Sequence, residues 1–334
     1  MFDKKILSLL VYSKGEINGD GLIKLPFVQA LRETFPDAKI TWCVEERIGT
    51  VYKTWLKPII SSLLDEIITL RINAPLKYFF LCRNPLDQKF DLIIDTQSKL
   101  LTSLLLKRAS KVFISSSANF LLSQRKPKYF PEKLTSQLET LLSLAAKKKI
   151  VCNPINLVDP KKIHLVEQLL PKGITYIGIA PGGGGQEKRW SLERCIALAE
   201  MQKSQGRQPV FILGPQEHEY KLPLQNACPY ALFPQENNLI TKEEANNPLF
   251  TIALATRFTV SVASNSGPGN MLAAAGTALV SLAKSFHQAK KFEPATKPLE
   301  TLIAEEYNCS NINDIPLEVI YSRIDKLLSL KNDA

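Results

Sequence analysis

Apolar residues recur along this chain in two alternating patterns. Short runs, such as residues 6–12 and 176–180, are almost continuously apolar, which is typical of strands buried on both faces of a sheet. Stretches such as residues 22–35 instead place apolar side chains three or four positions apart, as in a helix with one buried face. The repeated alternation predicts β-α units stacked around a parallel sheet, and therefore an α/β fold.

The first half of the chain predicts one doubly wound domain. Its predicted strands lie at residues 6–12, 40–44, 66–70, 92–95 and 112–114. Its predicted helices lie at residues 22–35, 51–56, 100–106 and 134–145. The stretch AAKKKIVCNPINLVDPKK, residues 145–162, then interrupts the alternation with a lysine run and two prolines, which is typical of a linker.

A second alternation follows the linker. Its predicted strands lie at residues 176–180, 209–213, 258–262 and 279–282, and its helices begin near residues 191, 216, 250 and 269. The chain is therefore expected to form two Rossmann-like doubly wound domains, residues 1–155 and 156–334, facing a cleft. Ligands of open α/β sheets bind beyond the carboxyl ends of the strands, so the loops that follow strands are the places to look for chemistry.

The composition is that of a globular protein. The chain has 334 residues, of which 45% are hydrophobic, enough for two cores of ordinary size. The apolar run near the N-terminus covers only about seven residues and is followed by no small-residue cleavage site, so a strand is expected there. The six cysteines form no CxxC pair and have no histidine nearby, which argues against a zinc site or a secreted disulfide framework and favours a reducing cytoplasm.

The charge of the chain favours anionic partners. Its formal net charge is +10 at pH 7, which suits a nucleotide, a nucleic acid or a membrane surface rich in acidic lipid. No zinc-finger, RNA-recognition or basic-helix signature accompanies this charge, so we expect no nucleic acid partner. A nicotinamide-dependent dehydrogenase is also disfavoured, because the first β-α turn, KGEINGDG, lacks the G-x-G-x-x-G spacing.

The stretch YIGIAPGGGGQEKRWSLER, residues 176–194, places glycines and two cations between a predicted strand and a helix start. Gly183 and Gly184 belong to a run of four glycines whose freedom at positive φ would let backbone amides converge on an anion. Lys188 and Arg189 supply positive charge, and Ser191 is suited to cap the following helix. The segment predicts a phosphate site, and the alternative is a flexible surface loop with a solvated Lys-Arg pair.

Asp20 lies between Gly19 and Gly21, directly before a predicted helix and beyond the carboxyl end of the first strand. An aspartate in this place most often caps the helix by accepting hydrogen bonds from amides of the first turn. Because both neighbours are glycines, Asp20 could instead be an accessible general base for a substrate hydroxyl. The two roles are compatible only if one carboxylate oxygen stays free.

Two further loops of the second half follow predicted strands. Glu217 comes shortly after the strand VFILGP, where it would either complement a helix dipole or reach a ribose hydroxyl. Asn265, Ser266 and Gly267 join a later strand to a helix, and this combination of polar donors, glycine and helix N-terminus suits an anion. The small residues at 273–276 suit close packing of that helix on the sheet.

Taken in order, these segments resemble glycosyltransferase family 9, the heptosyltransferases of lipopolysaccharide inner-core synthesis. GDGLIKLPFVQALRETFPDAKITWCVEE is similar to the opening of that family, and FDLIIDTQSKLLTSLLLKR is similar to its Y/F-D-x-x-I-D-x-Q segment. APGGGGQEKRWSLERCIALAE resembles its donor-phosphate loop, and ILGPQEHE resembles its G-x-x-x-E turn. SNSGPGNMLAAAG resembles its D-[ST]-G-x-x-H-x-x-A-A block, and the matches run in order over nearly the whole chain.

The resemblance implies a GT-B architecture, in which domain 1–155 binds a sugar acceptor and domain 156–334 binds a nucleotide-sugar. It also implies inversion at the anomeric carbon without a required metal or other cofactor. The implied catalytic residues are Asp20, as the base that deprotonates the acceptor hydroxyl, and Lys188, as the cation that neutralises the leaving diphosphate. The residues implied to bind the donor are Gly183, Gly184, Lys188, Glu217, Asn265, Ser266, Gly267 and Asn270.

The last of these segments departs from the family pattern. Asn265 stands where the family normally has Asp, and Asn270 stands where it normally has His. Both changes keep hydrogen bonding but delete a charge or a titratable ring, and charge-assisted hydrogen bonds are roughly twice as strong as neutral ones. We expect heptose transfer from ADP-heptose to a lipopolysaccharide-core or other lipid-linked acceptor, with a different nucleotide-sugar donor or lost activity as the alternatives.

Such an acceptor, together with the positive charge, implies a cytoplasmic protein in peripheral contact with the anionic inner face of the inner membrane. The C-terminal segment LEVIYSRIDKLLSL, residues 317–330, is amphipathic. It is expected to be a terminal helix that packs across both domains, and the alternative is a helix bound to the membrane surface.

Overall fold

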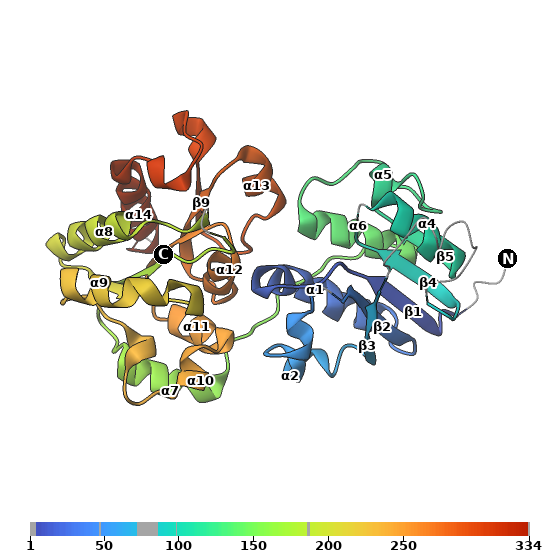
Figure 1. Cartoon of the computed structure of the whole chain (residues 1–334), viewed down its shortest axis with the longest axis horizontal. Helices are drawn as coiled ribbons and strands as arrows, with labels where there is room; N and C mark the ends of the chain where they lie inside the picture. Colours follow the sequence, from blue (N-terminus) through green and yellow to red (C-terminus); the bar gives the residue numbers. More distant parts are fainter. Residues whose placement is uncertain (1–4, 47, 72–85, 98, 186–187, 333–334) are drawn as a thin grey trace. The chain divides into compact units, whose positions relative to one another are not determined.

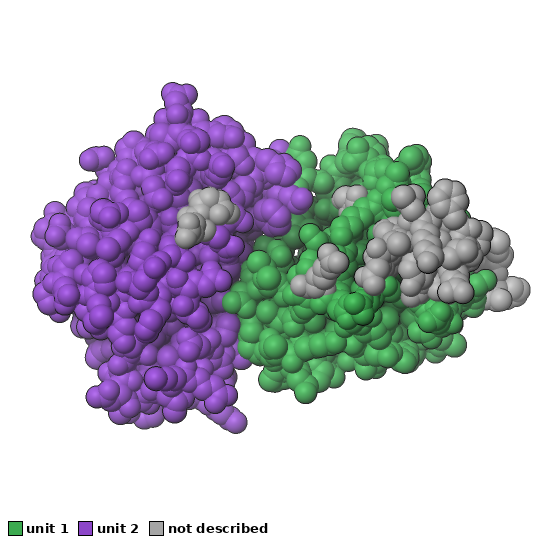
Figure 2. All heavy atoms as spheres, viewed as in Figure 1, with its two compact units in different colours: residues 1–154 green, residues 155–334 purple. Residues whose placement is uncertain are grey.

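The structure, a computed structural model, describes residues 5–46, 48–71, 86–97, 99–185 and 188–332. The chain divides into two compact units, Met1–Pro154 and Ile155–Ala334, which Figure 2 shows in different colours. The boundary lies one residue before the predicted one. Each unit is built around a five-stranded sheet in which all neighbouring strands are parallel, so the predicted α/β class is confirmed. The cleft expected between the units stays a prediction.

The first unit contains the five strands that the sequence predicts, in the order β3-β2-β1-β4-β5 (Figure 1). The strands are β1 (Ser8–Tyr12), β2 (Lys39–Glu45), β3 (Glu66–Leu70), β4 (Phe90–Asp95) and β5 (Ser110–Ser115). The helices are α1 (Asn18–Thr34), η1 (Val51–Lys53), α2 (Lys57–Ile60), α4 (Leu100–Arg108), α5 (Ser117–Phe120) and α6 (Leu134–Ala146).

One predicted helix of the first unit, at residues 51–56, is wrong. The chain forms the 3-10 turn η1 there, and α2 begins only at Lys57. Thr50 accepts a hydrogen bond from the amide of Tyr52 and so fixes the start of the short turn. Pro58 lacks an amide hydrogen and is tolerated only in the first turn of a helix, so the helix starts anew beside it.

The second unit contains five strands in the order β10-β9-β8-β6-β7. They are β6 (Tyr176–Ala180), β7 (Gln208–Phe211), β8 (Val260–Ser264), β9 (Ala278–Ala283) and β10 (Leu299–Ile303). The sequence predicts the first four, with β8 two residues too early, and misses β10. This edge strand is only partly buried over its first three residues, so it has no continuous apolar run.

Helices cover both faces of this second sheet (Figure 1). They are α7 (Pro160–Leu169), α8 (Leu192–Ser204), η3 (Pro215–Tyr220), α9 (Lys221–Ala227), η4 (Pro234–Glu236), α10 (Lys242–Ala245), α11 (Pro248–Ala255), α12 (Gly267–Ala274), α13 (Phe286–Lys291), η5 (Ala304–Tyr307), η6 (Ile312–Asp314) and α14 (Leu317–Asn332). The last residues of the predicted linker already belong to α7, because Asp159 caps that helix at the amide of Lys161.

Each sheet has a topological switch point beside the first strand of its unit. In the first sheet β1 lies between β2 and β4, and in the second sheet β6 lies between β7 and β8. The loops after adjacent strands diverge at such a point and leave a crevice for a ligand. The loops that carry the candidate residues follow β1 in the first unit and β6, β7 and β8 in the second.

The C-terminal helix α14 is part of the core of the second unit. Ile320, Ile324 and Leu327 are fully buried in the same hydrophobic cluster as residues of α8, β8 and β9. Because the apolar face of α14 is covered by its own unit, the alternative of a membrane-bound face is wrong. Within the described ranges, no helix combines the length and the apolar character needed to cross a bilayer.

This placement of α14 predicts a sharp difference between two of its apolar residues. Replacing fully buried Ile324 with alanine should lower the free energy of unfolding of the second unit by about 2 to 5 kcal/mol, because it leaves a cavity. Leu330 is 49% exposed on the same helix, so Leu330→Ala should change that free energy by no more than about 0.5 kcal/mol. Urea unfolding of both variants measures this difference, and equal effects would contradict the position of α14.

Candidate functional site

The glycine loop after β6 is packed closely on itself and on its surroundings. A Cβ atom on Gly182 would lie 2.8 Å from Oε2 of Glu217, and one on Gly183 would lie 2.6 Å from the carbonyl oxygen of Lys188. None of Gly182, Gly183 and Gly184 has a positive φ, so the predicted left-handed conformations are wrong. Gly182 and Gly183 are required for close approach, whereas Gly184 is exposed and faces open space.

Backbone hydrogen bonds close this loop and place Lys188. The amide of Lys188 donates to the carbonyl of Gly185 (3.0 Å), and the amide of Trp190 donates to the carbonyl of Pro181 (2.9 Å). The indole of Trp190 is buried in the core of the unit. Ser191 caps α8 as predicted, by accepting a hydrogen bond from the amide of Arg194 (3.4 Å). Lys188 is therefore a partly exposed cation between a tight loop and a buried anchor.

Glu217 lies beneath the loops that follow β6 and β7. Its side chain is buried, and its Oε2 accepts a hydrogen bond from the amide of Gly214 (3.1 Å). Burial raises the pKa of this carboxyl, while the Arg189 guanidinium and the amides of Gly214 and Gly183 oppose the rise. Glu217 lies in the first turn of η3 and accepts from its N-cap amide, so the predicted role at a helix start is confirmed, while the contact with a ribose stays a prediction. The carboxylate holds two loops together by contacts with protein groups.

Arg189 completes this arrangement, and the alternative of a solvated Lys-Arg pair is wrong for it. Its Nε lies 3.5 Å from Oε1 of Glu217, its Nη2 donates to the carbonyl of Gln216 (2.8 Å), and its Nη1 pairs with Glu219. Its guanidinium also lies 5.6 Å from the centre of the Tyr220 ring. Arg189 is therefore an internal cation of the loop cluster, which leaves Lys188 as the cation of the pair that can face a ligand.

The turn between β8 and α12 is bonded directly to the glycine loop. The hydroxyls of Ser264 and Ser266 both donate to the carbonyl of Gly182, at 2.8 and 3.2 Å. Asn270 donates from its Nδ2 to the carbonyl of Ser266 (2.9 Å), so its side chain stabilises the first turn of α12. The structure thus brings together four predicted site residues, Gly183, Ser266, Gly267 and Asn270, at the switch point between β6 and β8.

Single buried atoms of Arg189, Trp190 and Glu217 have no hydrogen-bond partner among the described residues, but in Asn265 both polar atoms of the side chain have none. Its backbone is fixed, since its amide donates to the carbonyl of Leu282 (2.7 Å) and its carbonyl accepts from Nε2 of Gln288 (3.1 Å). Its side chain is only 3% exposed, yet neither Oδ1 nor Nδ2 has a hydrogen-bond partner among the described residues. A buried amide without partners costs about 1 to 3 kcal/mol, so this side chain is suited to groups supplied by a ligand.

In the first unit, Asp20 is the third residue of α1 and is partly buried. The N-cap position belongs to Ile17, which makes no side-chain cap, so the predicted capping role of Asp20 is wrong. Its place in the first turn still favours a negative charge. Gly21 serves close packing, because a Cβ there would lie 2.4 Å from Cγ2 of Val51, and its carbonyl accepts a hydrogen bond from the Tyr52 hydroxyl (3.1 Å).

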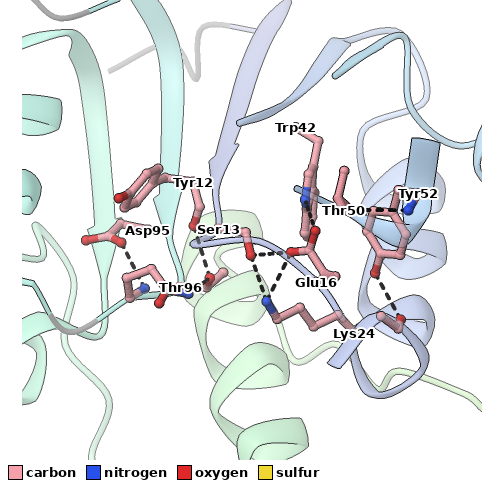
Figure 3. Close-up of polar contacts among 11 residues, drawn as sticks. Tyr12, Ser13, Glu16, Lys24, Trp42, Thr50, Tyr52, Asp95 and Thr96 are labelled. Atoms are coloured by element: carbon pink, nitrogen blue, oxygen red, sulfur yellow. Dashed lines mark hydrogen bonds and ion pairs between the residues drawn. The ribbon is translucent and has the colours of Figure 1, made fainter. Parts of the chain in front are cut away.

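A buried ion pair between Glu16 and Lys24 joins the loop after β1 to helix α1, which carries Asp20 (Figure 3). Nζ of Lys24 lies 3.1 Å from Oε1 of Glu16 and donates to the hydroxyl of Ser13 (2.7 Å). Oε2 of Glu16 accepts a hydrogen bond from Nε1 of Trp42 (3.2 Å), and Ser13 donates to Oε1. The sequence analysis missed this network. Its only signal was a lysine at position 24 within the apolar face of the predicted helix.

Asp95 lies at the end of β4, across the switch point from β1. Burial raises the pKa of its carboxyl to about 6, although hydroxyls of Ser103 and Ser115 (2.8 Å from Ser115) and the amide of Gln97 (2.9 Å) donate to it. It belongs to the FDLIIDTQ segment but was not singled out from the sequence. Its hydrogen bonds fix the ends of β4 and β5 rather than facing solvent.

These contacts predict different consequences for the two neighbouring cations. Arg189→Ala should destabilise the second unit by about 3 kcal/mol, because it leaves the Glu217 carboxylate buried without its cation. Lys188→Ala should change stability by no more than about 0.5 kcal/mol. Chemical unfolding of Arg189→Ala, Glu217→Gln and the double variant measures the coupling. A loss for Arg189→Ala as small as that for Lys188→Ala would contradict the internal role of Arg189.

Metal ligands and similarity to known proteins both bear on the chemistry of this chain. Among the described residues, no three His, Cys, Asp or Glu side chains gather in a way that could hold a metal ion. No protein-family profile matches the sequence, and no curated protein matches it. Solved structures provide the comparisons instead.

The chain is similar in structure to glycosyltransferases over almost its full length. A glycosyltransferase family 9 protein from Veillonella parvula is 18% identical, with a TM-score of 0.65 and coverage of 96% of this chain and 97% of that one. The ADP-heptose lipopolysaccharide heptosyltransferase II of E. coli is 16% identical, with a TM-score of 0.59 and coverage of 98% and 100%.

A UDP-GlcNAc 2-epimerase from Methanocaldococcus jannaschii shares the same architecture at a lower score. It is 12% identical, with a TM-score of 0.52 and coverage of 96% of this chain and 92% of that one. The architecture alone therefore does not choose between sugar transfer and epimerisation. The chain has the two Rossmann-like units of the GT-B fold and resembles the structures of glycosyltransferase family 9 over its whole length.

Proposed function

We propose that this protein is a glycosyltransferase of the family 9 type, which transfers a sugar from a nucleoside diphosphate to an acceptor hydroxyl. The observation that carries the proposal is the buried, unpartnered side chain of Asn265 beside the glycine loop. This side chain lies at the switch point of the second sheet, in the segment that resembles the donor site of that family, which supports a ligand site there. The structural similarity to the family 9 protein and to heptosyltransferase II supports the same reading.

The proposed reaction needs one base and one cation. The Asp20 carboxylate takes the proton of the acceptor hydroxyl, whose oxygen forms a bond to the anomeric carbon from the face opposite the leaving group. The bond between that carbon and the diphosphate oxygen breaks, and its electron pair stays on the diphosphate. Lys188 stabilises the negative charge that builds there, with the backbone amide of Gly184 as a further donor. The amide of Gly183 and the hydroxyl of Ser266 instead hold the loop, because they bond to Glu217 and to the carbonyl of Gly182.

The proposed reaction also requires a particular donor and a particular acceptor. ADP-heptose is named with the E. coli neighbour, so ADP-heptose or a relative is the proposed donor. A lipopolysaccharide-core or other lipid-linked glycan is the proposed acceptor, with inversion and without a required metal. The side chains of Glu217 and Asn270 already contact protein groups. They would therefore serve donor binding indirectly, by fixing the loops that contact the donor.

The first test concerns donor binding by Lys188. Lys188→Ala removes a charge-assisted contact of about 1.5 to 3 kcal/mol, so the dissociation constant for ADP should rise about 10- to 150-fold. Lys161→Ala, which removes an exposed lysine of the same unit, should leave it unchanged. Isothermal titration calorimetry measures both, and equal affinities of the two variants would remove Lys188 from the site. UDP-GlcNAc is included as a ligand to recognise an epimerase.

The second test concerns Asp20 as the base. Asn has nearly the same size but cannot take the proton, so Asp20→Asn should lower the rate of transfer by about two to four orders of magnitude. Since Asp20 is not the N-cap of α1, the melting temperature should stay nearly constant, and so should ADP affinity. The assay uses ADP-heptose with heptose-free core lipopolysaccharide, and other nucleotide-sugars in parallel.

The outcomes of this assay separate the alternatives. Undiminished transfer by Asp20→Asn would remove the base assignment. No transfer by the wild type with any donor, together with intact ADP binding, would support a protein that has lost turnover.

A further inference from the structure

Residues 121–133 of the first unit join α5 to α6 (Figure 1). Three large apolar side chains of this segment are exposed. Leu121 is 63% exposed, Tyr129 is 75% exposed and Phe130 is 58% exposed. Lys126 and Lys128 are exposed between them. Isolated exposed apolar residues are ordinary, but several in one segment with interleaved lysines indicate an interaction surface.

Contacts within the segment hold these side chains close together. The ring of Phe130 stacks on that of Phe120, with centroids 6.0 Å apart and an interplanar angle of 23°. Phe120 is buried and directly precedes Leu121, so Leu121 and Phe130 both adjoin this anchor, one through the chain and one through its ring. Nζ of Lys128 lies 5.3 Å from the centre of the Tyr129 ring. The three apolar side chains and the two lysines thus form one patch.

The base of the patch is fixed to the body of the first unit. Gln124 pairs with the edge strand β5, since its amide donates to the carbonyl of Phe113 (2.9 Å) and its Oε1 accepts from the amide of Phe113 (3.2 Å). Nη1 of Arg125 donates to the carbonyls of Leu144 (2.7 Å) and Ala145 (3.0 Å) at the end of α6. The exposed side chains therefore project from an anchored stretch of backbone.

The backbone just before the patch is strained. Ala118, Asn119 and Phe120 have φ angles of 47°, 52° and 63°, a left-handed conformation that costs energy for residues other than glycine. This turn directs Phe120 inward and leaves Leu121 in solvent. Strain that persists in a folded protein is concentrated at sites that bind or act, and here it coincides with the exposed patch.

The sequence around the patch is mainly basic. From residue 96 to residue 133 it contains eight lysines and arginines and one acidic residue, Glu132. Lys99 and Lys111 are paired with acidic residues of other elements, whereas Lys126 and Lys128 are exposed within the patch. A partner for this surface must therefore carry negative charge beside apolar groups. The headgroup region of an anionic bilayer has both, because aromatic and aliphatic side chains enter the boundary of the acyl chains while lysines meet the acidic headgroups.

We propose that the patch formed by Leu121, Lys126, Lys128, Tyr129 and Phe130 docks the protein on an anionic lipid surface. Docking there would hold the first unit, which carries Asp20, at the lipid surface. The binding itself needs neither a donor nor turnover, so its test is independent of the proposed reaction.

Flotation of the full chain with lipid vesicles tests this proposal. The wild type should float with vesicles of phosphatidylcholine and phosphatidylglycerol at low salt, much less with phosphatidylcholine alone, and less at physiological salt. Tyr129→Ser with Phe130→Ser should lower the partition coefficient about tenfold or more. Lys126→Glu with Lys128→Glu should lower it as much on the anionic vesicles.

Matched changes in the second unit serve as controls. Leu222→Ser with Leu239→Ser alters two side chains that are 68% and 64% exposed, and Lys161→Glu with Lys242→Glu reverses two exposed lysines. Both pairs should float like the wild type. Circular dichroism melting shows whether each variant is folded. Phe130→Trp offers a second readout, since its fluorescence should be quenched by brominated lipid in anionic vesicles.

Three outcomes would overturn the proposal. The first is a wild type that does not float with anionic vesicles at low salt. The second is a Tyr129→Ser, Phe130→Ser variant that floats as the wild type does, together with an unquenched Phe130→Trp. The third is a wild type that light scattering shows to be a dimer while the serine variant is a monomer, because the patch would then bind a second copy of the chain.

Discussion

The buried carboxylate of Glu217 is the interaction on which the candidate site depends. A carboxylate that has left water needs compensating partners, and here the amides of Gly214 and Gly183 donate to it while Arg189 forms an ion pair with Oε1. These donors reach it only because Gly182 and Gly214 have no side chain, since a Cβ on either would lie within 2.8 Å of Oε2. The close packing of Gly182, the ion pair of Arg189 and the turn after β7 all depend on the buried carboxyl of Glu217.

Both units fix a loop at the sheet's switch point by means of a buried ion pair. Each has a loop at the switch point of a parallel sheet, and each supports that loop with a buried glutamate paired to a cation, Glu217 with Arg189 and Glu16 with Lys24. Such pairs are weak sources of net stability, because desolvation offsets the attraction, but breaking one is expensive. Their effect is to leave the loops few alternative positions, which is what a site that must hold a ligand in one geometry requires.

The sequence was sufficient for most of the fold and for only part of the site. Apolar runs located nine of the ten strands in the described part of the chain, since most of these strands are buried along nearly their whole length. The edge strand β10 has no such continuous burial. Two alternatives, a helix cap for Asp20 and a solvated position for Arg189, were wrong for another reason. Spacing shows that a charge lies near a loop, but it does not show where the helix begins or which groups from other parts of the chain approach the charge. The tight packing beneath Gly182 depends on Glu217, 35 positions away, and no local pattern contains that contact.

Asn265 stands where the resembled family normally has Asp, and this difference can change the chemistry of the site without changing the fold. A carboxylate at this place would only accept hydrogen bonds, whereas the amide of asparagine both accepts and donates. With both of its polar atoms buried and unpartnered, Asn265 is matched by a ligand group that offers a donor and an acceptor together, as a sugar hydroxyl does. A cationic group, which only donates, would leave Nδ2 without a partner and would gain no charge attraction. For the proposed reaction, Asn265 therefore favours a donor sugar that presents an uncharged group, such as a hydroxyl, to the Asn265 side chain.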